Sequence, residues 1–395
     1  AELETKWGDG LAGFSTHDAA ADVGVFIEAT RAVSQPVRLV GVSYGTWWAH
    51  RYLSMFPGQV DAVALDSICF GAGCNFSEWD RNHHEVARML LTKCGADAFC
   101  RAKLGADPVQ MVTTLLNDLE AGHCPDAQAF GLTRAGLRRV FGAFVTDSAT
   151  LTLVPLIAYR LRRCSAQDVQ ALESLDYVLN AMAPDGVEET KPDSEDSLPL
   201  HHNVAFSELM RGPERTQAAL TAALHGLLAS TDSTPDLFRR RAVWPRYEPD
   251  PRADQTVYTS ARVVFLQGEL DARTPLASAK AHHHQLSGPG PGLIVFPGVG
   301  HSVTTRATTV LGTYCAMNAL ATWLTTPTDT LPGTCLKDLA PLHFEADGNA
   351  IGQQLGFGAT PWANVAPVVD PRTTQAGRRL LNLLRRRLHN PPGVR

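Results

Sequence analysis

The first seventy residues alternate between helical and strand-like hydrophobic patterns. Thr16 opens a run of apolar residues at helical spacing, which predicts a capped amphipathic helix. Residues 37–42 form a short run that is mostly apolar and rich in β-branched residues, as expected for a buried parallel strand. A helical pattern over 45–55 and a second strand pattern over 60–66 follow. Strand, helix and strand within about thirty residues predict a βαβ unit, and therefore a parallel sheet covered by helices.

The pattern becomes helical after residue 69, and strand-like runs return only at 262–268 and 292–296. This order predicts an α/β core that is interrupted by a helical insertion. A stretch rich in leucine and arginine over 378–389 predicts a terminal helix with a basic, solvated face. We therefore divide the chain into a first part of the core (1–68), a helical insertion (69–250), a second part of the core (251–345) and a C-terminal extension (346–395).

Composition excludes several classes of protein. The chain has 395 residues, of which 44% are hydrophobic and 19% charged, so it is neither disordered nor fibrous. The net charge is −5, and the acidic run over 184–200 alone carries −5, so the rest of the chain is balanced. Because the chain lacks a basic surplus, we expect no nucleic-acid partner. No apolar stretch approaches the roughly eighteen residues of a membrane helix, so we expect no membrane span. The cysteine spacing fits no zinc site, and we predict no metal and no organic cofactor.

A G-x-S-x-G pattern occupies residues 41–45, between a predicted strand and a predicted helix. The sharp reversal at such a junction strains the central residue, exposes its hydroxyl and favours small residues on either side. Ser43 is therefore a candidate nucleophile, and the N–H of Tyr44 can stabilise a developing oxyanion. The alternative is a glycine-rich turn with an incidental serine.

A nucleophilic serine needs a base and an acid that orients the base. In hydrolases with this turn, the order along the chain is serine, then acid, then histidine. Asp271 follows the strand at 262–268, and His301 follows the strand at 292–296. We take these two residues as acid and base. Glu269 and Asp66 also follow strands and remain alternative acids.

Three consecutive histidines, His282, His283 and His284, suggest a metal site at first sight. Consecutive residues on a helix point about 100° apart, so three in a row do not converge on one ion. We therefore interpret them as a solvated helix face.

These segments together resemble the tripeptidyl-aminopeptidase-like branch of the proline-iminopeptidase group of α/β-hydrolases. The similarity extends from about residue 14 to 340. It implies an α/β-hydrolase core with a helical cap, and a secreted or periplasmic serine exopeptidase that acts on peptides through an acyl-enzyme. It also implies that Ser43, Asp271 and His301 form the catalytic triad. The matching segments are 41–46, 65–67, 268–271, 274–275, 300–301, and Cys315 with 331–335.

The resemblance also implies that the cysteines form disulfides, since secreted proteins usually contain oxidised cysteines. The expected pairs are Cys94–Cys100 and Cys315–Cys335. The other four cysteines can pair as Cys69–Cys74 and Cys124–Cys164, although their pairing stays open.

Two features of the family bear on completeness and on substrate. Relatives have a His-Gly-Gly-Pro-Gly-type loop after an early strand, and no such loop precedes Ser43 here. We therefore expect a missing N-terminal part, such as a fragment of the protein's own precursor, to complete the fold as a partner. Glu208 lies in a segment that matches the family's pocket lining, so we expect it to bind the substrate's α-ammonium group. The alternative for Glu208 is a solvated helix face.

Two other functions remain open at this stage. An esterase or lipase would share the fold and the triad, and would differ only in the cap. A binding protein on an inactive hydrolase scaffold would retain the fold without turnover.

Overall fold

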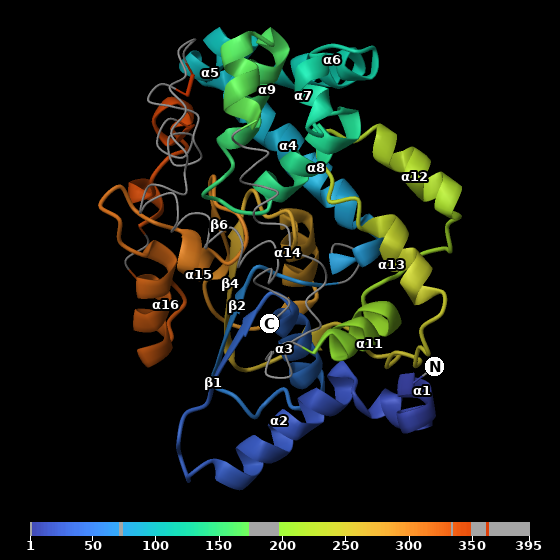
Figure 1. The fold of residues 1–395 in the computed structure, drawn as a ribbon. Coiled ribbons are helices and arrows are strands. Elements are labelled where there is room, and N and C mark those ends of the chain that lie inside the picture. Colours follow the sequence, from blue (N-terminus) through green and yellow to red (C-terminus); the bar gives the residue numbers. More distant parts are fainter. Residues whose placement is uncertain (1, 71–73, 174–196, 333–334, 349–360, 363–395) are drawn as a thin grey trace, which may run out of the picture. The chain divides into compact units, whose positions relative to one another are not determined.

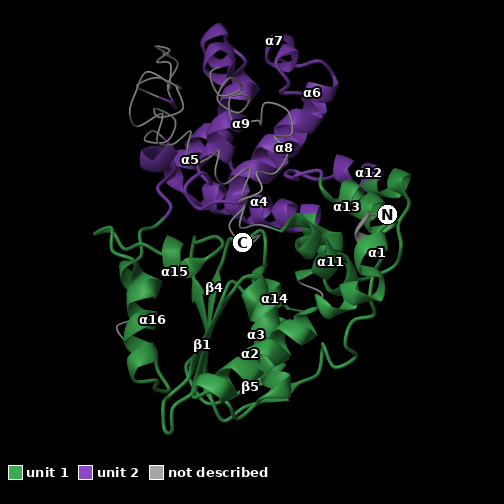
Figure 2. Ribbon diagram, turned by 60° about the horizontal axis from the view of Figure 1, so that its bottom comes forward, with its two compact units in different colours: residues 1–79, 197–220, 233–341 green, residues 80–196, 221–232, 342–395 purple. Residues whose placement is uncertain are grey.

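The computed structural model describes residues 2–70, 74–173, 197–332, 335–348 and 361–362 (Figure 1). Most of the acidic run and the whole leucine- and arginine-rich stretch at 378–389 lie outside these residues. The chain forms two compact units (Figure 2). The first unit comprises 1–79, 197–220 and 233–341, and the second comprises 80–196, 221–232 and 342–395.

The first unit is built on a four-stranded parallel sheet with the strand order β1-β2-β4-β6. In register, Val63 of β2 lies opposite Leu39 of β1 and Val263 of β4. The parallel α/β core predicted from the sequence is confirmed. On its outer side, β1 has no strand partner among the described residues, and its side chains Val40 and Val42 are 48% and 41% exposed. The strands are β1 (Arg38–Val42), β2 (Ala62–Asp66), β4 (Arg262–Gly268) and β6 (Gly292–Phe296).

Helices cover both faces of this sheet. Alternate residues of β2 and β4, such as Leu65 and Phe265, pack into one apolar cluster with α2, α3 and α14. The residues between them, such as Ala64 and Val264, pack into a second cluster with α15 and α16. Burial on both faces explains why these strands read as continuous apolar runs. The helices are α2 (Thr16–Thr30), α3 (Tyr44–Met55), α14 (Leu276–His283), α15 (Val303–Arg306) and α16 (Cys315–Thr325).

Part of the predicted insertion belongs to the first unit rather than to the second. Val204 of helix α11 and Leu209, which follows the helix, belong to the apolar cluster that contains α2 and α3, so this part of the chain packs with the sheet. The smaller elements are α1 (Glu2–Trp7), η1 (Gly8–Gly13), η3 (Phe76–Glu78), α11 (Leu198–Glu208), α12 (Gln217–His225), α13 (Thr234–Arg241), β3 (Val257–Tyr258), β5 (Leu286–Ser287) and η4 (Leu336–Asp338).

The second unit is helical over its described part. Several helices begin at side chains that accept the first free backbone N–H groups: Asp97 caps α5 and Asp107 caps α6. Pro108 occupies the first turn of α6, where its missing N–H costs nothing. The helices are α4 (Trp79–Ala96), α5 (Ala98–Leu104), α6 (Pro108–Glu120), α7 (Pro125–Ala129), α8 (Arg134–Val145) and α9 (Leu153–Arg163).

All eight cysteines are joined in disulfides. The two expected pairs, Cys94–Cys100 and Cys315–Cys335, are present. The four cysteines whose pairing stayed open are joined as Cys69–Cys74 and Cys124–Cys164. Over the described part of the chain, no helix combines the length and the apolar character that crossing a membrane requires.

Candidate active site

Ser43 lies at the junction between β1 and α3, in a conformation that side chains rarely adopt. Its φ is 57° and its ψ is −125°, so the backbone is constrained at this residue. A Cβ atom on Gly41 would lie 2.5 Å from the Gly45 carbonyl oxygen, which explains the first glycine of the pattern. A Cβ atom on Gly45 would meet open space, so steric crowding does not explain the second glycine. The turn leaves the Ser43 side chain at the carboxyl edge of the sheet, with 8% of the residue exposed.

Tyr44 is the first residue of α3, so its N–H has no partner within the helix and is available to an oxyanion. The Tyr44 side chain contributes to packing between helices rather than to the oxyanion site. The Tyr44 hydroxyl lies 2.8 Å from Thr16 Oγ1, and burial raises the pKa of this hydroxyl above its usual value. The side chain therefore stays protonated and ties α3 to the start of α2.

Asp271 and His301 lie in contact after β4 and β6. The Nδ1 atom of His301 is 2.9 Å from Asp271 Oδ2 and 3.0 Å from Oδ1. The Asp271 carboxylate also accepts the N–H groups of Arg273 and Thr274 and the Thr274 hydroxyl. Burial alone would raise the pKa of Asp271, but His301 and the Thr274 donors lower it overall. An ionised Asp271 can therefore hold the imidazole ring and support a positive charge on it.

The other ring nitrogen of His301 is available for proton transfer. His301 Nε2 is buried and has no hydrogen-bond partner in the described part of the structure, so no bond joins it to Ser43 Oγ. Both segments are nevertheless anchored at the end of β2. The Ser43 N–H donates to the Asp66 carbonyl at 2.9 Å, and the Ser302 N–H donates to Ser67 Oγ at 2.6 Å. Contacts between a nucleophile and its base often tighten only when substrate binds.

The two alternative acids have other partners. Glu269 accepts the N–H of Gly298 at 2.8 Å. The Asp66 carboxylate accepts the N–H groups of Val303 and Thr304 and the Thr304 hydroxyl, so it holds the loop that follows His301. Asp271 is the carboxylate that is hydrogen-bonded to the imidazole.

Gln267 and Thr46 were not singled out from the sequence, although both connect parts of the site. Gln267 Nε2 donates to the Thr274 carbonyl at 2.8 Å and lies 3.3 Å from Asp271 Oδ2. The Thr46 hydroxyl donates to the Ser43 carbonyl at 2.7 Å. A polar residue inside the apolar run at 262–268 is the signal that could have identified Gln267, because a buried amide must find partners.

Glu208 is buried, with 5% of the residue exposed, so its interpretation as part of a solvated helix face is wrong. Its carboxylate accepts the Thr16 N–H at 2.9 Å, the Trp47 indole N–H at 2.8 Å and the Tyr247 hydroxyl. Burial and the charge of Glu208 raise the pKa of Tyr247, which therefore remains a donor. These partners come from three separate segments, and this is why spacing along the chain did not reveal the burial.

Glu208 lines a cavity of about 290 Å³ in the first unit. Arg51 is 2% exposed there and is paired with Asp250, which also contacts His17. Four carboxylates face two arginines around the cavity, and this excess of negative charge favours a cationic ligand. The lining residues are Ala12, Ser15, His17, Asp18, Arg51, Glu208, Tyr247, Glu248, Asp250, Pro251 and Arg252.

The expectation of a solvated helix face is wrong for His282, whereas His284 is exposed. His282 is fully buried, with Nε2 2.8 Å from His50 Nδ1 and its ring stacked on Phe70. The Nε2 atom of His50 in turn lies 3.0 Å from the Gln255 carbonyl oxygen. Burial lowers the pKa of His50 to about 4 and lowers that of His282 as well. Within the described ranges, no three His, Cys, Asp or Glu side chains are grouped so that they could hold a metal ion.

A parallel sheet flanked by helices, with a strained G-x-S-x-G turn at its carboxyl edge, defines the α/β-hydrolase fold class. Residues 237–335 match the family model described as TAP-like protein, so this part of the chain is similar to the tripeptidyl-aminopeptidase-like α/β-hydrolases. The matched segment contains Asp271 and His301 but not Ser43, so the geometry of the serine turn is independent support for a hydrolase. No curated protein sequence matches the chain.

Proposed function

We propose that the protein is a serine peptidase that releases residues or short peptides from the N-terminus of peptide substrates. One observation carries the proposal: the strained turn at Ser43 lies at the same sheet edge as the hydrogen-bonded pair of Asp271 and His301. The family match supports a hydrolase and is consistent with a peptidase.

The proposed reaction proceeds through an acyl-enzyme. Ser43 Oγ attacks the scissile carbonyl carbon while His301 Nε2 takes the serine proton, and the same nitrogen then protonates the leaving amine. Asp271 orients the imidazole through Nδ1 and stabilises its positive charge. The Tyr44 N–H stabilises the oxyanion. Water then enters, and His301 activates it to release the acyl group. His301 Nε2 has no hydrogen-bond partner among the described residues, and this supports the assignment.

Specificity for a free N-terminus is assigned to Glu208. A cation in a partly dry pocket needs a carboxylate partner, and Glu208 is a buried carboxylate that lines a cavity. Among the described residues its Oε2 atom accepts one hydrogen bond, from Trp47, so this oxygen retains capacity for a substrate N–H. Trp47 follows Ser43 by one turn of α3, about 6 Å along the helix axis. The amine would therefore bind close to the nucleophile.

Labelling of Ser43 with a fluorophosphonate probe tests whether the protein is a serine hydrolase. A peptide p-nitroanilide with a free N-terminus, compared with its acetylated form, then tests the type of substrate. We expect labelling at Ser43 and faster cleavage of the free-amine substrate. Rapid cleavage of p-nitrophenyl esters without peptide turnover would instead indicate an esterase, and failure to label would favour an inactive scaffold.

The Glu208→Gln variant tests the amine site. We expect a higher KM for free-amine substrates and little change for blocked ones, with kcat/KM lowered by roughly ten- to a hundredfold, which corresponds to about 1.5–3 kcal/mol. Glu248→Gln is the matched control, because Glu248 lines the same cavity but is exposed. Equal losses on free and acetylated substrates would contradict the role of Glu208.

Export from the cytoplasm is part of the proposal. Four disulfides that include every cysteine support an oxidising compartment, as in secreted or periplasmic proteins.

A further inference from the structure

Segment 66–70, which ends β2 and continues beyond it, contacts all three loops that carry the proposed triad. At its start, Asp66 and Ser67 hold the loop after His301 through the N–H groups of residues 302–304. The Asp66 carbonyl also accepts the Ser43 N–H. The segment therefore lies between the nucleophile and the base.

Three consecutive N–H groups of this segment are bonded to buried side chains from three other elements. The N–H of Ile68 donates to Gln267 Oε1 at 2.8 Å, that of Cys69 to Thr46 Oγ1 at 2.8 Å, and that of Phe70 to Ser278 Oγ at 3.0 Å. A loop with irregular backbone is thus fixed at every residue by a specific partner.

Two of these partners reach the triad loops themselves. Thr46 accepts from Cys69 and donates to the Ser43 carbonyl, so one hydroxyl joins the segment to the serine turn. Gln267 accepts from Ile68 and donates toward Asp271, so one amide joins the segment to the acid. A displacement of segment 66–70 would be transmitted to the nucleophile and to the acid–base pair.

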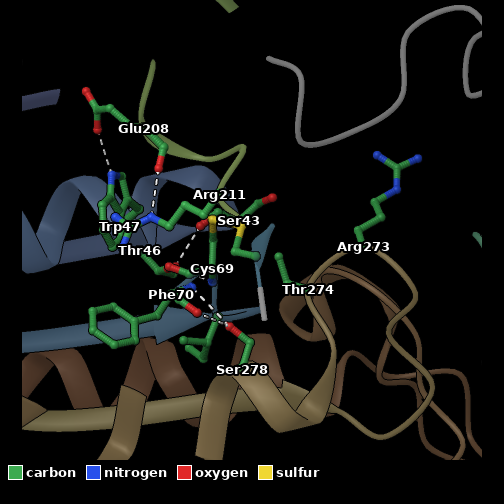
Figure 3. The surroundings of a disulfide bond; sticks show 12 residues. Ser43, Thr46, Trp47, Cys69, Phe70, Glu208, Arg211, Arg273, Thr274 and Ser278 are labelled. Carbon is green, nitrogen blue, oxygen red and sulfur yellow. Dashed lines mark hydrogen bonds between the residues drawn. A yellow bond between two sulfur atoms is a disulfide. The ribbon is translucent and has the colours of Figure 1, made fainter. Parts of the chain in front are cut away.

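The Cys69–Cys74 disulfide closes the far end of this segment (Figure 3). Ser43, Thr46 and Thr274 are among the side chains that surround it. Beyond Cys74 the chain is fixed again, because Asn75 exchanges two hydrogen bonds with the backbone of Arg211 at 3.0 and 3.1 Å. The disulfide is therefore a covalent link, in addition to the main chain, between segment 66–70 and a second fixed point.

We propose that the Cys69–Cys74 disulfide is a positioning element of the active site, which keeps segment 66–70 in the place that aligns Ser43 with Asp271 and His301. This inference rests on the proposed serine-hydrolase function. Its role differs from that of the Cys94–Cys100 disulfide, which spans a similar number of residues within the helices of the second unit.

The test compares two double variants in the full-length protein, Cys69→Ala with Cys74→Ala and Cys94→Ala with Cys100→Ala. The bridges span 5 and 6 residues, so their loss should lower the melting temperature by similar amounts. We expect the first variant to lose about ten- to a hundredfold in kcat with little change in KM, because misaligned reacting groups lower the rate of chemistry. The control should keep its kcat within about twofold.

A second pair of variants keeps the proposal testable if the first double variant does not fold. Thr46→Val removes the hydroxyl that joins Cys69 to Ser43, and Thr46→Ser retains it. We expect Thr46→Val to lower kcat and the rate of fluorophosphonate labelling together, and Thr46→Ser to restore both. Equal kcat in Thr46→Val and Thr46→Ser would overturn the proposal.

Labelling of the wild type distinguishes failure of the proposed serine-hydrolase function from failure of the proposed role of the disulfide. If Ser43 of the wild type is not labelled, the proposed function itself fails. If the wild type is labelled and the variant lacking Cys69–Cys74 is labelled at the same rate, the function stands and the positioning role of the disulfide is wrong.

Discussion

Two serines end adjacent strands with the same unusual backbone angle and opposite surroundings. Ser43 follows β1 and Ser67 follows β2, each with a φ of 57°. Ser67 is fully buried, and its hydroxyl donates to Asp66 at 3.0 Å and accepts the Ser302 N–H. The Ser43 hydroxyl enters no hydrogen bond with the described residues. A positive φ therefore marks a constrained turn, and the partners of the hydroxyl determine whether it can react.

The sequences around the two serines differ for a steric reason. The chain enters α3 directly after Ser43, so the first helical turn brings the Gly45 carbonyl against Gly41. After Ser67 the chain continues as a loop, and the equivalent position holds Leu65, a large residue. Gly41 is therefore required by the junction of strand and helix. The positive φ of the serine does not by itself require a glycine two residues earlier.

Alanine at each serine should produce the largest contrast. We expect Ser43→Ala to abolish labelling and to lower turnover at least about a thousandfold, with an unchanged free energy of unfolding. Ser67→Ala leaves the buried Ser302 N–H without its acceptor, so we expect it to lower the free energy of unfolding by about 1–3 kcal/mol and to slow labelling without abolishing it, because Ser67 also holds the loop after His301. Turnover assays and urea unfolding measure the two effects. Loss of labelling in a fully stable Ser67→Ala variant would contradict this comparison.

Alanine at the two glycines should produce the next largest contrast. Gly41→Ala forces a carbon against the backbone of the first turn of α3, so we expect displacement of Ser43 and a loss of about a hundredfold in kcat/KM. Gly45→Ala meets open space within a helix, and should preserve activity and add up to about 1 kcal/mol of stability. Steady-state rates and thermal unfolding check both. A Gly45→Ala enzyme as impaired as Gly41→Ala would show that the crowding is not specific to Gly41.

The smallest expected effect concerns the histidine pair beneath the loop that follows Ser67. Phe70 of that loop stacks on His282, which is bonded to His50. Below pH 6.5 the unfolded chain binds a proton at His50, whereas the folded protein does so only near its lowered pKa of about 4. The free energy of unfolding therefore falls with falling pH, by about 2 kcal/mol between pH 7 and 5 from this group.

Urea unfolding at pH 7 and pH 5 measures this dependence. His50→Gln keeps a hydrogen-bonding side chain that does not titrate, and should flatten the dependence relative to wild type. An identical pH dependence in the variant would exclude His50 as its source.

The sheet and the ends of its strands could be predicted from local pattern. Each strand is a short apolar run, and parallel strands bring the residues that follow them to one edge. This reasoning is sufficient to find Asp271 and His301 and to expect their contact. The strained turn at Ser43 was predictable as well, because a strand and a helix flank the pattern.

The buried polar groups were not predictable in this way. Their partners are far away in sequence: His50 and His282 are 232 residues apart, and Trp47 and Glu208 are 161 residues apart. A helical or strand-like period reports which face of an element is buried, but not which polar side chain meets a partner there. For the same reason the pattern did not show that Val204 of α11, within the predicted insertion, packs with α2 and α3.

The pairing of β2 with β4 has a consequence for synthesis of the protein. Val63 lies opposite Val263, although 200 residues separate them along the chain. A ribosome adds roughly 5–20 residues per second, so about 10–40 seconds pass before β2 meets this neighbour. The helices of the second unit form from closer segments and can assemble during that interval. Until β4 emerges, one edge of the apolar strand β2 has no strand partner and can aggregate. A chaperone that binds nascent chains would therefore be needed most at this stage.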